Sequence, residues 1–101
     1  MSLRALERVA ALRLLVLLYH KGKMSIQQLR NELDASGLAI YNSIEALKKI
    51  NLIYDEYEEH FPRRRLVSLT PLGRKIAEHL IEIEKLLTET GKGGEGGGGS
   101  R

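Results

Sequence analysis

The stretch over residues 25–53 constrains the fold of this chain more than any other, because it predicts two helices joined by a turn of only two residues. Ser25 is followed three residues later by Gln28, which is the spacing of a capping box at the start of a helix. Apolar residues then recur at helical spacing and predict one buried face, at Ile26, Leu29 and Leu33. We therefore expect the first helix to end before a turn at Asp34 and Ala35.

The second helix of this pair is predicted over residues 36–50. Ser36 has a side chain suited to an N-cap. A second buried face follows at steps of four, three and three residues, at Ile40, Ile44, Leu47 and Ile50. Asn51 tolerates the left-handed conformation that often follows the end of a helix. The apolar and aromatic residues from Leu52 onward favour a strand, so the helix is expected to end at Asn51.

The other face of the second helix is left uncovered, since a helix pair with so short a turn cannot hide it. This face carries Gly37, Leu38, Tyr41, Asn42, Glu45 and Lys48. The layout is that of a helix-turn-helix, whose second helix enters the major groove of DNA. An ordinary helical hairpin with a solvated face explains this stretch alone equally well.

Size and charge leave both interpretations open. The chain has 101 residues, which is enough for one domain and too few for two. It contains no cysteine, and this excludes a disulfide framework and a thiolate metal site. A net charge of +3 and a pI of about 9.3 permit nucleic-acid binding without requiring it.

The most apolar segment, Val9 to Leu18, indicates neither a membrane span nor an export signal. Arg13 interrupts it, and it is shorter than the ~20 residues that cross a bilayer. No small-residue cleavage site follows, because the next residues include His20, Lys21, Gly22 and Lys23. We therefore expect no membrane partner and a cytoplasmic location.

Two further helices are predicted at the ends of the chain. The first covers Leu3 to Tyr19, where Leu and Ala dominate and Gly and Pro are absent. From Val9 onward it is apolar nearly all round, so it needs a second cover, either the C-terminal helix or a partner chain. The last begins at Thr70-Pro71, an N-cap followed by a proline at the first helical position, and is expected to run to about Thr88 or Glu89.

A hairpin and a tail complete the predicted organisation. Two strands are expected over Leu52 to Glu58 and Arg65 to Leu69, joined by a loop that contains Pro62. A two-stranded hairpin alone is marginally stable, so it must lie against the helices or pair with a third short strand near Met24. The Gly-rich end of the chain cannot bury a core. We predict a domain over residues 1–89 and a flexible tail over residues 90–101.

The order helix, helix, helix, hairpin, helix resembles a winged helix-turn-helix domain. One matching run lies at the second helix of the pair, at Ser36, Ile40-Tyr41, Leu47 and Asn51-Leu52-Ile53. At position 51 this chain has Asn, where such domains more commonly have Gly. The run from Arg65 to Arg74 is similar to the V-x-L-T-x-x-G-R joint of MarR- and PadR-like transcriptional regulators. The resemblance implies a mainly α fold with a small β hairpin (α+β), in which the hairpin loop is a wing that touches DNA.

The expected function is that of a transcriptional regulator that binds double-stranded DNA sequence-specifically, with residues 36–50 in the major groove and the wing, residues 59–65, on the backbone or minor groove. Asn42 is the candidate base reader, because an amide can bond an adenine edge through N6 and N7 together. As alternatives, Asn42 is a solvated helix residue and Tyr41 is partly buried under the wing. Further candidate DNA contacts are Gln27, Ser36, Leu38, Tyr41, Lys48 and Lys49.

The predicted wing combines a basic cluster, Arg63, Arg64 and Arg65, with acidic residues before it. Since successive side chains of a strand point to opposite faces, we expect two of the three arginines to contact phosphates or the minor groove. The acidic residues are Asp55, Glu56, Glu58 and Glu59. They would repel phosphate, or pair with the arginines, or mark a surface for a protein partner. The alternative function is therefore a protein–protein interaction adaptor built on the same fold.

The terminal helices present more apolar surface than one small domain can cover, so a homodimer is expected. The candidate interface residues are Leu3, Leu6, Ile76, Leu80, Ile83 and Leu87. No catalytic constellation is evident, and the three histidines lie in different predicted elements. We expect no enzymatic activity, no metal site and no cofactor, and the pattern leaves any small-molecule effector open.

Overall fold

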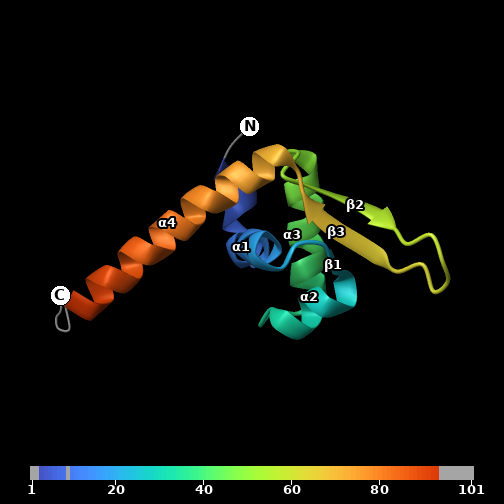
Figure 1. Ribbon diagram of the computed structural model, residues 1–101, viewed down its shortest axis with the longest axis horizontal. Helices are drawn as coiled ribbons and strands as arrows, with labels where there is room; N and C mark the ends of the chain where they lie inside the picture. The colour runs from blue at the N-terminus through green and yellow to red at the C-terminus, as the bar shows by residue number, and fades with distance from the viewer. Residues whose placement is uncertain (1–2, 9, 94–101) are drawn as a thin grey trace.

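The computed structural model describes residues 3–8 and 10–93, whose arrangement is shown in Figure 1. The helices are η1 (Leu3–Glu7, a 3-10 helix), α1 (Ala11–Lys21), α2 (Ile26–Glu32), α3 (Gly37–Lys49) and α4 (Pro71–Gly93). The strands are β1 (Met24–Ser25), β2 (Ile53–Tyr57) and β3 (Arg65–Leu69). This order confirms the predicted α+β fold. None of the helices within the described ranges is both long enough and apolar enough to cross a membrane.

The helix-turn-helix forms as its capping residues predict. The backbone N–H of Gln28 donates to Ser25 Oγ at 3.1 Å, and the backbone N–H of Ser25 donates to Gln28 Oε1 at 2.8 Å. At the start of α3, the backbone N–H of Ala39 donates to Ser36 Oγ at 3.1 Å. Asn51 has the expected left-handed conformation, with φ of 63°. The predicted inner face of α3 is buried at Ile40, Ile44 and Leu47.

The sheet has three antiparallel strands in the order β1-β3-β2, which confirms that the hairpin pairs with a third strand at Met24. Met24 lies opposite Val67, while β2 pairs with β3 from Ile53–Leu69 to Tyr57–Arg65. The strand β2 is one residue shorter at each end than predicted. β3 puts Val67 into the core, and the hairpin loop extends away from the helices (Figure 1).

The joint between β3 and α4 is fixed by Thr70, Gly73 and the end of α3. The hydroxyl of Thr70 donates to the backbone carbonyl of Asn51 at 2.7 Å and accepts from the backbone N–H of Gly73 at 2.9 Å, which is the predicted N-cap. A Cβ on Gly73 would lie 1.9 Å from the carbonyl oxygen of Leu52. Only glycine therefore allows α4 to approach the end of α3 this closely.

The N-terminal region corrects the prediction of one continuous helix over residues 3–19. The chain forms η1, turns at Ala10 with a left-handed φ of 74°, and then begins α1. Positive φ is rare for alanine, so tertiary packing must stabilise the turn. The turn allows η1 to contact both α1 and α3, with Leu6 packed against the core. One straight helix could not supply both the buried face of α1 and this contact with α3.

The last helix leaves the body of the protein. Its first turns pack on α1 and β3, with Ala77 fully buried, and its later turns project outward, which contributes to the elongated extents of 52 × 29 × 22 Å (Figure 1). The helix continues to Gly93, beyond the predicted end at Thr88 or Glu89. Residues 94–101 of the predicted tail lie outside the described residues. The division into a domain and a flexible tail stays a prediction.

Candidate nucleic-acid interface

The outer face of α3 is exposed, and it carries the predicted recognition residues. Leu38 is 69% exposed and Tyr41 is 52% exposed, while Ser36 and Asn42 are also exposed. The exposure of Tyr41 argues against burial under the wing. On α2, Gln27 is exposed and donates to Asn31 Oδ1 at 3.3 Å. These side chains are free of core packing, and their contact with DNA stays a prediction.

Four charged residues connect α3 to the hairpin, and we call Glu45, Lys48, Asp55 and Arg65 the helix–hairpin brace. Asp55 Oδ2 on β2 accepts from Arg65 Nε at 2.6 Å and from Lys48 Nζ at 3.1 Å. Glu45 Oε2 accepts from Arg65 Nη2 at 3.2 Å and lies 3.8 Å from Lys48 Nζ. Two predicted DNA contacts, Lys48 and Arg65, are thus held by carboxylates of the same chain.

The pKa values of Asp55 and Arg65 are both shifted in the direction that favours the charged form. Partial burial raises the pKa of the Asp55 carboxyl, but hydrogen bonds from Lys48 and Arg65 outweigh this effect, and the pKa is lowered overall. Burial lowers the pKa of the Arg65 guanidinium, and hydrogen bonds to Asp55 and Glu45 reverse the shift, so that the pKa is raised. Both groups are charged at neutral pH, and the brace fixes the orientation of the hairpin relative to α3.

The wing is held by a second set of contacts at the end of the hairpin. Arg64 donates to the Glu58 carboxylate from its backbone N–H at 3.1 Å and from Nη2 at 2.8 Å. Arg63 has a left-handed φ of 54°, and its Nη1 donates to the backbone carbonyl of Glu59 at 3.2 Å. Phe61, at the tip, is 92% exposed. The guanidinium of Arg63 contacts the backbone carbonyl of Glu59 and has no carboxylate partner among the described residues.

Most of the acidic residues that precede the wing are paired with cations. Asp55 pairs with Lys48 and Arg65, Glu58 pairs with Arg64, and Glu56 accepts from Lys23 Nζ at 2.8 Å. The hydrogen bonds with Arg64 lower the pKa of Glu58. Pairing with the arginines was one of three expected roles for these acids. Because each of the three carboxylates has a neighbouring cation, their repulsion of an approaching phosphate is reduced.

The residues beside α3 include two arginines that sequence reasoning missed. Arg4 and Arg8 of the N-terminal segment line a shallow cavity of about 390 Å³ together with Asn42 and Lys49 of α3. The two arginines lie four residues apart, a helical spacing that hinted at a shared face. Their position beside α3 could not be predicted, because it depends on the turn at Ala10.

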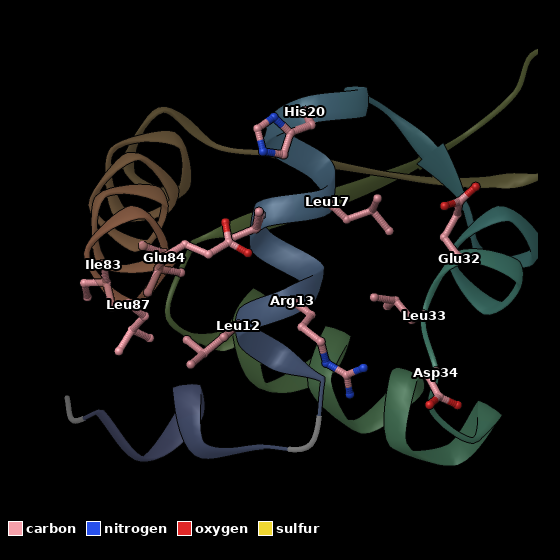
Figure 2. Close-up of a pocket in the computed structure, with 12 residues that line it drawn as sticks. Leu12, Arg13, Leu17, His20, Glu32, Leu33, Asp34, Ile83, Glu84 and Leu87 are labelled. Carbon is pink, nitrogen blue, oxygen red and sulfur yellow. The ribbon is translucent and has the colours of Figure 1, made fainter. Parts of the chain in front are cut away.

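The predicted dimer residues divide into two groups. Leu6, Ile76 and Leu80 are partly buried against the core of the same chain. Ile83 and Leu87 are 51% and 68% exposed. These two line an open groove of about 450 Å³ together with Leu12, Leu17 and Leu33. In Figure 2, α1 lies between α4 and Leu33, with Leu12 on the side of Leu87 and Leu17 on the side of Leu33. The side chain of Leu3 lies outside the described residues.

No group of three or more His, Cys, Asp or Glu residues that could hold a metal ion occurs within residues 3–8 and 10–93. The features that stand out there are charged and amide groups around α3, together with the apolar groove beside α4.

Comparison with known proteins supports the fold. No protein-family model matches the chain, and no curated protein does. A transcriptional regulator homologue from Pyrococcus horikoshii OT3 superposes with a TM-score of 0.72 at 19% identity, over 85% of this chain and 86% of that one. A proposed transcriptional regulator of the MarR family from Porphyromonas gingivalis W83 gives 0.73 at 23% identity, over 86% and 85%.

A variant of ZitR from Lactococcus lactis in its apo form also matches. Its TM-score is 0.73 at 24% identity, over 86% of this chain and 66% of that one, so the chain spans just under two thirds of that ZitR chain. At these identities the likeness concerns the fold. The arrangement of helices, sheet and hairpin is that of a winged helix-turn-helix domain, as the resemblance implied.

Proposed function

We propose that this protein is a transcriptional regulator that binds double-stranded DNA sequence-specifically as a homodimer. The observation that carries the proposal is the exposed outer face of α3, which is held in a fixed orientation to a protruding hairpin by the helix–hairpin brace. A helix presented in this way can enter the major groove while the wing follows the backbone or minor groove. The fold shared with proteins named as transcriptional regulators supports the same function.

Within this proposal, the candidate residues have different roles. Asn42 reads a base edge, with Leu38 and Tyr41 beside it, and Gln27 and Ser36 lie toward the backbone. Arg63 contacts phosphate, because it has no carboxylate partner among the described residues. Arg65 and Lys48 act mainly by positioning the hairpin, since both are bound by Asp55. Arg64 contributes to either role, because it is half exposed beside Glu58.

The dimer is proposed from the exposed apolar residues of α4. Ile83, Leu86 and Leu87 project beyond the core of their own chain, next to the groove along α1. A two-fold axis near these turns would cover the same residues of both chains. It would also place two copies of α3 roughly 34–36 Å apart, about one turn of DNA, and this predicts an inverted-repeat site.

The experiment is a selection from a random-sequence duplex library, followed by fluorescence anisotropy titrations of the selected duplex in a salt series. We expect an enriched inverted repeat whose affinity exceeds that of an unselected duplex. Arg63→Ala should lower the slope of log affinity against log salt by about 0.9 if it removes one phosphate contact. No enrichment, with binding only at low salt, would contradict sequence-specific regulation.

The second candidate function is a protein–protein interaction adaptor. It is favoured by the exposed aromatic residues of the hairpin, where Phe61 is almost fully exposed and Tyr54 and Tyr57 are also accessible. Aromatic side chains of this kind are enriched at protein interfaces. Tyr57→Ser separates the two functions, because Tyr57 is exposed on β2 and lies before the wing residues 59–65. It should leave DNA binding nearly unchanged for a regulator and weaken partner binding for an adaptor.

A further inference from the structure

The N-terminal segment packs along α3 on a different side from the hairpin. Glu45 and Lys48 of α3 face the hairpin through the helix–hairpin brace. Ala46 and Ile50 lie on another side of the helix, because each residue advances about 100° around an axis with 3.6 residues per turn. These two line the cavity that contains Arg4 and Arg8. The two basic regions, on the wing and on the N-terminal segment, therefore flank α3.

The surroundings of Arg4 and Arg8 are positively charged. Their cavity, of about 390 Å³, also contains Lys49 and Asn42. An adjoining cavity of about 230 Å³ shares Arg8 and Asn42 with it. Of the described residues that line the larger cavity, only Glu45 carries a carboxylate. That carboxylate accepts from Arg65 Nη2 at 3.2 Å. The cavity therefore contains three cationic side chains and one carboxylate that already pairs with a cation of the hairpin.

Packing fixes this segment while its charged ends stay in solvent. Ala10 is buried, Leu6 packs against the core, and both arginines are exposed. Arg8 and Lys49 have no ion-pair partner among the residues that the structure describes. An exposed guanidinium on a fixed backbone is well suited to phosphate, which it can bind through two parallel hydrogen bonds.

We propose that Arg4 and Arg8, together with Lys49, bind phosphates of the DNA strand that flanks α3 on the side opposite the wing. This inference rests on the proposed function and deepens it. A helix in the major groove has a phosphate backbone on each side. The wing follows one backbone, and the N-terminal segment binds the other. Because Arg8 and Asn42 line the same two cavities, this contact also fixes the register of Asn42 against the bases.

The test uses the duplex selected by the wild-type protein, labelled for anisotropy and titrated between about 50 and 200 mM salt. Arg8→Gln should lower the salt slope by about 0.9, so its loss of affinity relative to wild type should be about 3.5-fold larger at the low-salt end. Arg4→Gln combined with Arg8→Gln should lower the slope about twice as much. Arg8→Lys should retain the wild-type slope, since it keeps a point charge.

The matched control is Arg74→Gln, which removes an exposed arginine whose guanidinium lies 5.4 Å from the ring centre of Tyr19 on α1. Its slope should equal that of the wild type. Thermal melts establish that each variant is folded, and Arg4→Gln alone replaces Arg8→Gln if the latter does not fold.

Two results would overturn the inference while leaving DNA binding intact. The first is a slope of log affinity against log salt that equals the wild-type slope in Arg8→Gln, or in Arg4→Gln if that variant is used instead. The second is a slope that falls equally in Arg8→Lys and Arg8→Gln. The first means that no phosphate contact was removed, and the second means that charge is not the cause. A wild-type protein that binds no duplex at all would instead refute the proposed function, and this inference with it.

Discussion

Asp55→Asn tests the helix–hairpin brace directly, because Asp55 is the carboxylate that binds both cations. The change removes a charge from two hydrogen bonds, at 2.6 Å to Arg65 Nε and at 3.1 Å to Lys48 Nζ. Hydrogen bonds to charged groups contribute about 1.5–3 kcal/mol each. Both cations keep Glu45 nearby, and the asparagine oxygen can still accept one bond. We therefore expect a loss of about 1–2 kcal/mol in the free energy of unfolding.

The assay is urea denaturation with thermal melting at neutral pH. For a domain of this size, the expected loss corresponds to a melting temperature lower by about 5–15 °C. Glu59→Gln is the control, because it neutralises an exposed wing carboxylate that takes part in the described contacts only through its backbone carbonyl. It should change stability by less than about 0.5 kcal/mol.

The pH dependence identifies the cause of the effect. The pKa of Asp55 is lower in the folded protein than its ordinary value of 3.8, so the unfolded chain binds the proton first as the pH falls. The stabilisation by Asp55 is therefore present above the unfolded pKa and is lost as the pH falls through the folded pKa. The stability gap between wild type and Asp55→Asn should be full at pH about 6 and should narrow below about 4. A gap that stays constant across this range would refute an ionic origin.

Three further changes test other parts of the molecule. Asn42→Ala should cost ~1–3 kcal/mol in binding the selected duplex and relax preference at one base pair, with an unchanged melting temperature; unfolding would contradict its exposed position. Ile83→Glu should convert a dimer to a monomer in sedimentation equilibrium, and a wild-type monomer would contradict the interface. Gly73→Ala should lower stability by about 3 kcal/mol in urea denaturation, because its Cβ would meet the carbonyl oxygen of Leu52; wild-type stability would show that the joint can open.

Local signals in the sequence were enough for most of the elements. Ser25 and Ser36 cap the helices they were expected to cap, because a capping side chain bonds within its own turn. The limits of β3 and the N-cap at Thr70 followed from short-range patterns of the same kind. The pairing of β1 with β3 could also be anticipated, since a hairpin alone is too small to be stable.

The N-terminal break is a feature that only the tertiary structure decided. Residues 3–19 have high helix propensity throughout, and nothing local marks Ala10 as a turn. The turn exists because it allows η1 to contact α3 while α1 remains in the core. Packing of this kind outweighs propensity differences, which amount to less than about 1 kcal/mol per residue. The location of Arg4 and Arg8 beside α3 follows from it.

The sequence determined which charged residues surround the predicted DNA-binding surface, and the tertiary structure decided which of them are paired. Arg63, Arg64 and Arg65 form one basic run, yet Arg65 binds Glu45, which lies 20 residues away in the chain. Arg64 binds Glu58 across the loop, and Arg63 contacts only a backbone carbonyl within the described contacts. Pairing depends on distances of a few ångströms between side chains on different elements, and such distances are fixed only when α3, β2 and β3 pack together.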